Sequence, residues 1–552
     1  MQAAILFEPD GYLLDRAKLM GRQSAGNGFL RAAVAASPGG TLSAYTPSQQ
    51  SFDLFAQTVT GLDPTVRPHW IPAVRLDLLA EAGTLYRPDS AIDISAALRL
   101  RQGLAAYSLC GVTHTLSSEL SLRHLFDLLT TPIMPWDALV CTSQAALTLV
   151  RDALTQHADY LSWRIGQPVK PPHFQLPIIP LGVHAEDFAT SDPARAAARQ
   201  RLGIAEDEIV ALYAGRLSFS GKAHPVSMLR GLQAAHERTG HKIVLIQAGS
   251  FFNDAIARLY RDAAAKFSPD VRPLFVDGND FPAYAASWQA ADLFVSLADS
   301  IQETFGLTPV EAMAAGLPVV VSDWNGYKDT VRDGIDGFRI RSWAPPATAD
   351  DMIARDHETH TGNFDMYLVR AGGAISIDQR QLNDRLSDLV GDAELRAKMG
   401  AAGRARVRSD YDWSILYPRY LALWEELAAI RAAHAREPEW IARIAAAPLH
   451  HPIAPDPYAL FAHYPTALIT THTMVEAAPG AGLAGFEAMA RDPLFAFSNP
   501  PAELVTAVLG ALARPCTVGE IVAASGQDLY SVTDAVARLA KMGLVVLGAP
   551  TA

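Results

Sequence analysis

The chain has 552 residues, of which 49% are hydrophobic and 19% charged, and its formal net charge is −12. This length exceeds what one core supports, so two large domains and a further module are expected, and the composition excludes a disordered chain. The negative charge and the absence of a long basic run argue against a nucleic-acid binder that neutralises phosphates.

The three cysteines, Cys110, Cys141 and Cys516, lack the spacing of a metal site or of a disulfide framework. The start of the chain has no signal-peptide pattern, and no apolar run reaches the roughly 18 residues of a transmembrane helix. These features predict a cytoplasmic protein without a transmembrane segment, for which peripheral contact with a membrane stays open.

Residues 1–183 alternate short apolar runs with helical patterns. A buried strand is predicted at residues 3–7, followed by a glycine-rich loop through Gly26-Asn27-Gly28 and a helix from Phe29. Further strands are predicted at 42–45, 84–86, 106–109, 138–141 and 174–179, and helices fall between most of them, as at 143–161. Such alternation favours a parallel sheet that is covered by helices on both faces.

A turn at residues 180–184 separates a second series of the same kind. Its strands are predicted at 209–213, 242–248, 271–276, 293–297 and 318–322, and its helices at 226–238, 254–266, 282–290 and 308–315. The predicted fold class is therefore α/β, with two doubly wound Rossmann-like domains, 1–183 and 184–410, facing a cleft. Residues 341–377 indicate an irregular insertion, after which helices resume over 381–407.

The last part of the chain changes character. A long amphipathic helix over 411–435 is expected to pack back on the N-terminal domain, and residues 436–500 are expected to form a linker. Residues 501–552 resemble a winged-helix module, in which Thr517 and Glu520 form a capping box. Its second helix offers only Arg538 and Lys541 as cations, too few for DNA, so a protein or peptide partner or a purely structural cap is expected.

The segment around Glu303 and Glu311 carries the chemical prediction. A buried strand ends near Leu297, a loop carries Glu303, and a helix begins near Leu307 with Pro309 in its first turn. The free amides of a helix start form an anion site. The two carboxylates cannot neutralise a phosphate, so they should bind hydroxyl groups. A phosphate flanked by polyols on both sides indicates a sugar nucleotide.

These residues also carry a family resemblance. The segment from Glu303 onwards resembles the signature of retaining glycosyltransferases of the family-four type, which have the GT-B fold. It consists of Glu303, seven further residues, Glu311 and then Ala-Met-Ala-Ala-Gly-Leu-Pro-Val-Val. Ala214-Gly215-Arg216-Leu217, followed by Lys222, is similar to a second family motif. The resemblance extends over roughly residues 1–435 and is strongest over 209–340.

The resemblance implies a role for each matching residue. Arg216 and Lys222 would hold the diphosphate of a donor without a metal ion, because two fixed cations can stabilise the charge of the leaving nucleotide. Glu303 would contact hydroxyls of the donor sugar, and Glu311 those of the ribose. The other implied donor or catalytic residues are Gly215, the amides of Phe305, Gly306 and Leu307, His114 from the opposite domain, and the Gly26-Asn27-Gly28 loop. No cofactor is expected.

The predicted partners are a nucleotide-diphosphate sugar and a saccharide or glycoconjugate acceptor, in a bacterial envelope or natural-product pathway. Residues 324–329 are bulkier than the small, glycine-rich sequence usual in the family, so the family's donor preference cannot be transferred. Two alternatives stay open: a nucleotide-sugar epimerase on the same fold, and a non-catalytic protein that binds sugar nucleotides and recruits a partner through its last module.

Overall fold

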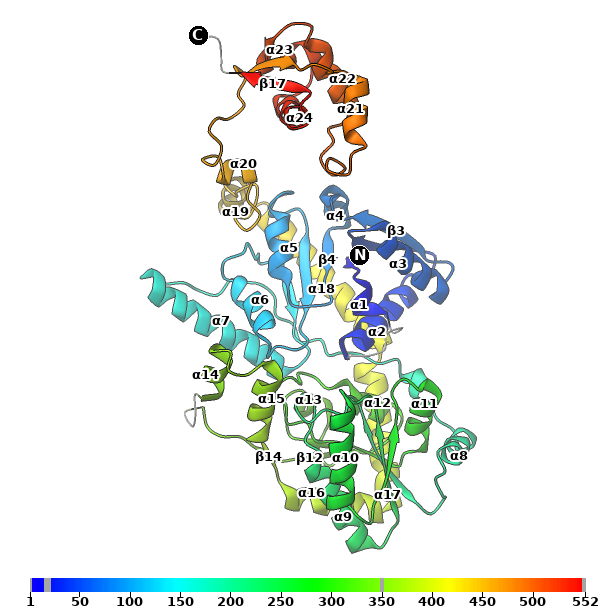
Figure 1. Ribbon diagram of the computed structural model, residues 1–552. Helices are drawn as coiled ribbons and strands as arrows, with labels where there is room; N and C mark the ends of the chain where they lie inside the picture. Colours follow the sequence, from blue (N-terminus) through cyan, green and yellow to red (C-terminus); the bar gives the residue numbers. More distant parts are fainter. Residues whose placement is uncertain (1, 14–20, 348–351, 549–552) are drawn as a thin grey trace. The chain divides into compact units, whose positions relative to one another are not determined.

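The computed structural model describes residues 2–13, 21–347 and 352–548 of the chain (Figure 1). The chain divides into two compact units, Met1–His451 and Pro452–Ala552, and each is described by itself. Among the residues described, no helix is long and apolar enough to cross a membrane. The first unit contains two six-stranded sheets, and the second contains one small sheet.

The N-terminal sheet is parallel throughout, with the order β3-β2-β1-β4-β5-β6. Its strands are β1 (Ala4–Leu6), β2 (Thr41–Thr46), β3 (Arg67–Pro72), β4 (Thr84–Tyr86), β5 (Ser108–Val112) and β6 (Ala138–Val140). The helices between them are α1 (Pro9–Tyr12), α2 (Gly21–Ala35), α3 (Gln49–Leu62), α4 (Leu76–Ala82), α5 (Ile92–Arg99) and α6 (Glu119–Asp127), and α7 (Gln144–Ile165) follows the last strand. The strand order reverses direction between β1 and β4.

The second sheet repeats this order as β12-β11-β10-β7-β8-β9, again all parallel. Its strands are β7 (Ile209–Ala214), β8 (Ile243–Ala248), β9 (Arg272–Val276), β10 (Leu293–Ser296), β11 (Val319–Ser322) and β12 (Gly337–Ile340). The helices of this half are α8 (Asp192–Arg201), α9 (Val226–Thr239), α10 (Asp254–Phe267), α11 (Phe281–Ala290), α12 (Leu307–Ala314), α13 (Tyr327–Thr330), α16 (Gln379–Gly391) and α17 (Ala393–Arg406). Two doubly wound sheets with one strand order confirm the predicted α/β, GT-B fold class.

Helix α18 (Trp413–His434) returns to the N-terminal sheet. Its aromatic side chains are buried in the same core as β1 and α2. Phe29 of α2 stacks on Tyr86 at 4.1 Å between ring centroids, and the ring of Trp413 meets Phe29 edge-on at 5.8 Å. Since α18 follows the second sheet in the chain but packs on the first, it ties the two halves of this unit together.

Two edge strands and one inner segment differ from prediction. β3 and β12, both at sheet edges, are absent from the predicted strands. β3 contains Pro68 and Pro72, which lack the amide hydrogen of a sheet residue and are tolerated at an edge. The strand predicted at 174–179 is wrong: this segment makes only isolated bridges, from Gln175 to Ala138 and from Ile178 to Cys141.

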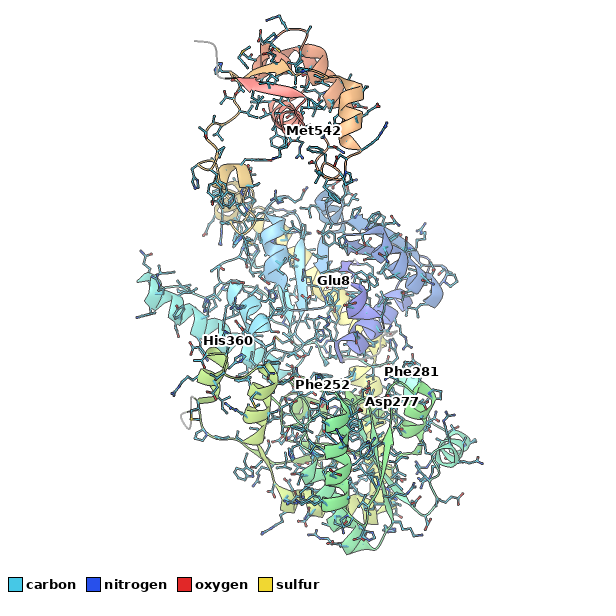
Figure 2. All side chains as sticks on the ribbon, viewed as in Figure 1. Glu8, Phe252, Asp277, Phe281, His360 and Met542 are labelled. Carbon is cyan, nitrogen blue, oxygen red and sulfur yellow. The ribbon has the colours of Figure 1, made fainter. Side chains whose placement is uncertain are left out.

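The predicted irregular insertion, 341–377, contains regular structure, so that prediction is wrong for the residues described; 348–351 lie outside them. It forms β13 (Ser342–Trp343), α14 (Met352–Glu358), α15 (Phe364–Gly373) and β14 (Ser376–Ile377). Arg123, and beyond it His360 and His357, lower the pKa of Glu119 at the start of α6. Figure 2 labels His360, which lies in this insertion.

The predicted linker over 436–500 also needs correction. α19 (Pro438–Ala445) lies in the first unit, where Trp440 packs edge-on against Trp136 at 5.5 Å. The second unit holds α20 (Pro457–Leu460), and its β15 (Met474–Ala477) forms the middle strand of a sheet in the order β16-β15-β17. Only Val475 of this strand is buried, so the sequence offers no apolar run that would indicate it.

The remaining elements of the second unit are α21 (Leu483–Ala490), α22 (Ala502–Ala511), β16 (Cys516–Thr517), α23 (Val518–Ser525), α24 (Leu529–Lys541) and β17 (Val545–Gly548). The sheet is antiparallel, and the helices bury Val505, Ile521 and Val536 in a core of their own. The capping box of Thr517 and Glu520 is present as predicted. The resemblance to a winged helix stays a prediction, and residues 549–552 lie outside the description.

Candidate active site

Two loops that follow neighbouring strands of the second sheet carry the predicted site residues. The loop after β7 contains Gly215, Arg216 and Lys222, and the loop after β10 contains Glu303. β7 and β10 are paired at the position where the strand order reverses. In doubly wound sheets ligands bind at this position, outside the carboxyl ends of the strands.

Charged and polar contacts join these two loops. Lys222 Nζ lies 2.7 Å from Glu303 Oε2, and Arg216 Nη2 donates to the side-chain oxygen of Gln302 at 3.3 Å. The side chains of Lys222 and Glu303 are 30% and 11% exposed. The structure thus brings both predicted cations to the loop of the predicted acidic residue and leaves Lys222 partly accessible.

The turn after β7 is held by close backbone contacts. Gly215 has a φ of +133°, a backbone conformation that residues other than glycine rarely adopt. A Cβ at Gly249 would lie 1.9 Å from the carbonyl oxygen of Gly215, so glycine is required there too. The hydroxyl of Tyr213 donates to the carbonyl oxygen of Arg216 at 3.0 Å. These contacts fix the direction in which the Arg216 segment leaves the sheet.

Helix α12 starts directly behind Glu303. Its N-cap residue, Gly306, has a φ of +82°, and no side chain caps the helix. A Cβ on Gly306 would lie 1.9 Å from Cε1 of the buried Tyr327, so only glycine fits. The first amide groups of a helix have no partner inside it, and they carry the positive end of its dipole. The predicted amide donors of Phe305, Gly306 and Leu307 therefore lie at this uncapped helix start.

Glu311 lies one turn inside α12, as predicted. Burial raises the pKa of its carboxyl group to about 7, although the charge of Lys222 opposes this shift. Glu311 therefore lies within electrostatic reach of Lys222, the cation that pairs with Glu303.

We expect Glu311 to make the stability of the protein depend on pH. Its pKa is about 7 in the folded state, above its ordinary value of 4.5, so between these values the folded state binds more protons than the unfolded state. The free energy of unfolding should then fall as the pH rises through this interval. Glu311→Gln should raise it by about 1–3 kcal/mol more at pH 8 than at pH 5, measured by urea unfolding. An equal effect at both pH values would contradict the assignment.

His114 reaches the site from the N-terminal sheet. It follows β5, and its carbonyl oxygen accepts a hydrogen bond of 2.6 Å from Oγ1 of Thr304, next to Glu303. Ser143, at the start of α7, donates to the carbonyl oxygen of Thr304 at 2.8 Å. Burial lowers the pKa of His114 to about 4, and the charge of Arg22 acts in the same direction. The imidazole is therefore neutral at pH 7 and can accept a hydrogen bond.

The glycine loop predicted at Gly26-Asn27-Gly28 is wrong, because these residues lie inside α2. A Cβ at Gly26 would meet the carbonyl oxygen of Gly11 at 2.0 Å, and one at Gly28 would meet Nε1 of Trp413 at 2.5 Å. The Asn27 amide donates to the carbonyl oxygen of Tyr12 at 3.1 Å. The small residues let α1 and α18 approach α2, which is a packing role, and they form no phosphate loop.

Sequence reasoning missed the contacts that hold the Glu303 loop from its other side. The side-chain amide of Asn325 donates to the carbonyl oxygen of Glu303 at 2.6 Å, and Trp324 Nε1 donates to that of Ser300 at 3.1 Å. Asn325 has a φ of +36°, which non-glycine residues seldom adopt. The bulky sequence at 324–329 was the available signal, but its hydrogen bonds depend on the folded loop.

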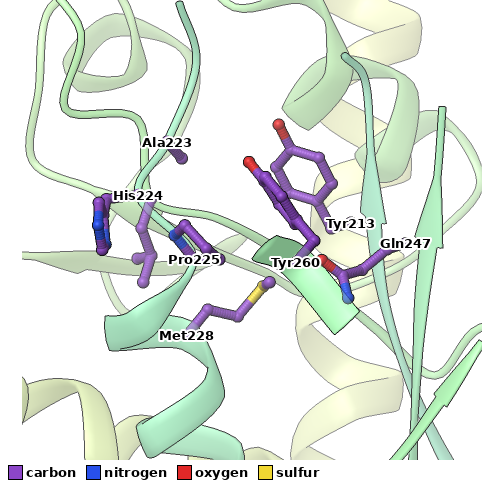
Figure 3. Close-up of a pocket in the computed structure, with 8 residues that line it drawn as sticks. Tyr213, Ala223, His224, Pro225, Met228, Gln247 and Tyr260 are labelled. Carbon is purple, nitrogen blue, oxygen red and sulfur yellow. The ribbon is translucent and has the colours of Figure 1, made fainter. Parts of the chain in front are cut away.

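A small cavity lies beneath the β7 loop (Figure 3). Its volume is about 10 Å³, and Tyr213, His224, Gln247 and Tyr260 are among its lining residues. Among the residues described, the buried amide of Gln247 has no partner for either polar atom. The cavity has room for one water molecule and none for a nucleotide.

Comparison with known protein families finds a match for the segment that carries the second sheet. Residues 194–355 match the family model for glycosyl transferases group 1. This segment, less than half of the chain, is therefore similar to that family, which the motifs also resemble.

Particular relatives are D-inositol 3-phosphate glycosyltransferases. That of Geodermatophilus obscurus is 33% identical over 174 residues, which cover 30% of this chain and 37% of the relative. That of Nocardia farcinica is 28% identical over 182 residues, which cover 33% and 39%. The chain thus spans less than half the length of these relatives.

Among solved structures, HepE (Alr3699) from Anabaena in complex with UDP is 15% identical, with a TM-score of 0.49, over 78% of this chain and all of the other. Sucrose-phosphate synthase from Thermosynechococcus elongatus is 18% identical, with a TM-score of 0.48, over the same shares. The strand orders above define the fold independently of these likenesses.

Proposed function

We propose that the first unit is a retaining glycosyltransferase that moves a sugar from a nucleotide diphosphate to a hydroxyl group of a saccharide, glycoconjugate or other acceptor. One observation carries the proposal: Lys222 and Glu303 lie 2.7 Å apart at the reversal of strand order, beside the uncapped start of α12. The family match of residues 194–355 and the glycosyltransferase relatives support it.

The donor diphosphate would bind between the two loops. The oxygen that joins the sugar to the phosphate gains charge as the bond breaks, and Arg216, Lys222 and the amides of α12 can stabilise that charge. Phosphate oxygens compete with Glu303 for Lys222, so donor binding would release the Glu303 carboxylate. The released carboxylate can then accept hydrogen bonds from hydroxyls of the donor sugar, and Glu311 from those of the ribose.

Retention of configuration needs no protein nucleophile at this site. The acceptor oxygen attacks the anomeric carbon on the face from which the nucleotide departs. As the new carbon–oxygen bond forms, the old one breaks, its electron pair passes to the phosphate, and the phosphate accepts the proton of the acceptor hydroxyl. The neutral imidazole of His114 would accept a hydrogen bond from the donor sugar.

Incubation with UDP-, GDP- and ADP-linked sugars tests this function. A donor that raises the melting temperature identifies the base, since a ligand that prefers the folded state stabilises it. With that donor, release of the nucleoside diphosphate should accompany a new glycoside, and proton NMR should show the anomeric configuration of the donor. An inverted product would contradict retention, and absence of any turnover with all three classes would contradict the activity.

The two alternatives predict different products. An epimerase would consume the sugar nucleotide without an acceptor and release an isomer of the free sugar or of the donor. A non-catalytic binding protein would be stabilised by the donor but leave it intact over a long incubation. The pairing of Lys222 with Glu303 favours turnover, because the proposed reaction uses one group at the leaving phosphate and the other at the donor sugar.

We expect full activity in excess EDTA. Side-chain cations at the diphosphate take the role that a metal ion has in other nucleotide-sugar enzymes, so chelation removes nothing the reaction needs. Turnover should be equal in EDTA-treated enzyme and in enzyme supplied with Mg²⁺ or Mn²⁺. Activity that returns only with added metal would contradict this prediction, and no other cofactor is proposed.

The second unit is proposed to recruit a protein or peptide partner. Arg538 is paired with Asp534 at 2.7 Å, which weakens a role in binding nucleic acid. Truncation after His451 should leave donor turnover unchanged, because the candidate site and its supporting helix α18 lie wholly in the first unit. The measurement is the rate of nucleoside diphosphate release. Insolubility of the truncated protein would instead indicate a structural cap.

A further inference from the structure

A groove of about 710 Å³ lies between α6 and α7 on one side and residues 325–329 on the other. Its lining combines the apolar side chains of Leu122, Phe126 and Leu149 with polar ones, among them Asp152 and Gln156. A mixed lining of this kind, with a few directed polar groups over an apolar floor, is typical of a ligand site.

The groove is connected to the candidate active site by two hydrogen-bonded contacts. Asn325, which lines the groove, donates to the backbone of Glu303 at 2.6 Å. Gln144 and Asp329 also line it, and the backbone amide of Gln144 donates to Asp329 Oδ2 at 2.6 Å. The preceding residue, Ser143, binds the backbone of Thr304. A molecule in the groove would therefore end beside the Glu303 loop.

A row of aromatic rings continues the groove along α7. His157 stacks on Phe126 with 4.5 Å between ring centroids, Tyr160 lies 5.9 Å from His157, and Trp163 lies 5.7 Å from Tyr160. Tyr160 and Trp163 are 53% and 75% exposed. Residues three apart share one face of a helix, so these rings and the groove lining form one continuous surface. The surface defined by Phe126, His157, Tyr160 and Trp163 is called the aromatic row.

We propose that the groove and the aromatic row bind an oligosaccharide acceptor, with its reacting end at the Glu303 loop and its further sugar units on the exposed rings. This inference rests on the proposed function and names its substrate class. Sugar rings present apolar C–H faces that pack on aromatic rings, and their hydroxyls suit carboxylate and amide partners such as Asp152 and Gln156. From Gln144 to Trp163 the helix rises about 28 Å, more than one sugar unit covers.

Charge argues for a saccharide over a lipid surface. Helices that lie on membranes carry many lysines and arginines on their polar face. α7 has two of each sign, namely Arg151 and Arg164 against Asp152 and Asp159, so it has no net attraction for anionic lipids. A neutral, polyhydroxylated chain has no such requirement.

Replacement of the two exposed rings, Tyr160→Ala with Trp163→Ala, tests the proposal in the full chain. On a glycan array, the wild type should bind a set of oligosaccharides, and the double variant should bind them about tenfold more weakly. The control is Phe497→Ala in the second unit, which removes an aromatic ring that is even more exposed than Tyr160 and Trp163. It should bind as the wild type does, and all three proteins should share one melting temperature.

Donor hydrolysis separates this proposal from the proposed function. The double variant should hydrolyse the nucleotide sugar at the wild-type rate but show a raised KM for the oligosaccharide. Equal glycan binding by variant and wild type, or no glycan binding by the wild type, would overturn the aromatic row as an acceptor site. Binding to phosphatidylcholine–phosphatidylglycerol vesicles that is lost in the double variant would overturn it in favour of a membrane surface. If the wild type did not hydrolyse any donor, that result would contradict the proposed function and would leave the glycan-binding test of the aromatic row unaffected.

Discussion

Asp137→Ala is expected to lower the free energy of unfolding by about 3–5 kcal/mol, because it leaves a buried positive charge without its partner. Both side chains of the Arg99–Asp137 pair are fully buried, with Nη1 to Oδ1 at 2.6 Å and Nη2 to Oδ2 at 2.7 Å. Asp137 also accepts hydrogen bonds from the amides of Leu109 and Met134. The loss therefore removes an ion pair and leaves two buried amides without their acceptor.

Urea unfolding of the chain truncated after His451 measures this effect on one unit. Asp137→Asn keeps an acceptor oxygen for one of the two amides, so its loss should be smaller than that of Asp137→Ala. The control is Asp207→Ala, whose partner Lys242 is 70% exposed, and which should change stability little. An effect of Asp137→Ala no larger than that of the control would contradict the account of this pair.

The position of the Arg99–Asp137 pair explains why its loss should also affect the candidate active site. Asp137 directly precedes β6, and Arg99 ends α5, while the bonded amide of Leu109 belongs to β5. One carboxylate thus fixes a helix and two strands of the N-terminal sheet. These strands lead to His114 and to Ser143, which form hydrogen bonds with Thr304 in the loop after β10. Loss of the pair should therefore loosen the candidate site as well.

The sequence was sufficient for elements with a strong apolar pattern. β7, β8 and β10 are continuous buried runs, and a parallel sheet covered on both faces requires such runs. β3 was missed because an edge strand is covered less and tolerates proline and charge. The sequence Arg67-Pro68-His69-Trp70 has no apolar run to detect.

Glycine misled the prediction for α2. Gly26 and Gly28 look like turn residues because glycine is costly inside a helix. In the folded protein that cost is offset by contacts with Gly11 and Trp413, which permit no larger side chain. Trp413 lies 385 positions along the chain from Gly28, so no local pattern could reveal this contact.

The candidate site was predictable where it depends on the order of buried strands, and not where it depends on contacts within a folded loop. Lys222 and Glu303 stand at the ends of adjacent strands in a fold whose strand order follows from the pattern, so their proximity could be expected. Asn325 could not, because its contact with the Glu303 backbone depends on a left-handed conformation within the loop. That contact joins the candidate active site to the groove along α7.

Lys222→Ala is expected to lower kcat/KM for the donor by about 100- to 1000-fold, the usual cost of removing one group that stabilises charge in the transition state. Lys222 pairs with Glu303 at 2.7 Å, and its charge also acts on Glu311. Its side chain is 30% exposed, so the fold should tolerate the change. Lys242→Ala, at an exposed lysine far from the site, is the matched control and should keep full activity.

Two measurements distinguish lost chemistry from lost structure. The melting temperature of Lys222→Ala should equal that of the wild type without ligand, and the stabilisation by the nucleoside diphosphate should shrink, because a phosphate contact is gone. Glu303→Gln should behave differently: it keeps the affinity for the nucleoside diphosphate, which has no sugar, and loses turnover of the sugar nucleotide. If Lys222→Ala bound and turned over the donor as the wild type does, the cation would have no part in holding the diphosphate, and the arrangement of Arg216, Lys222 and α12 would need another ligand.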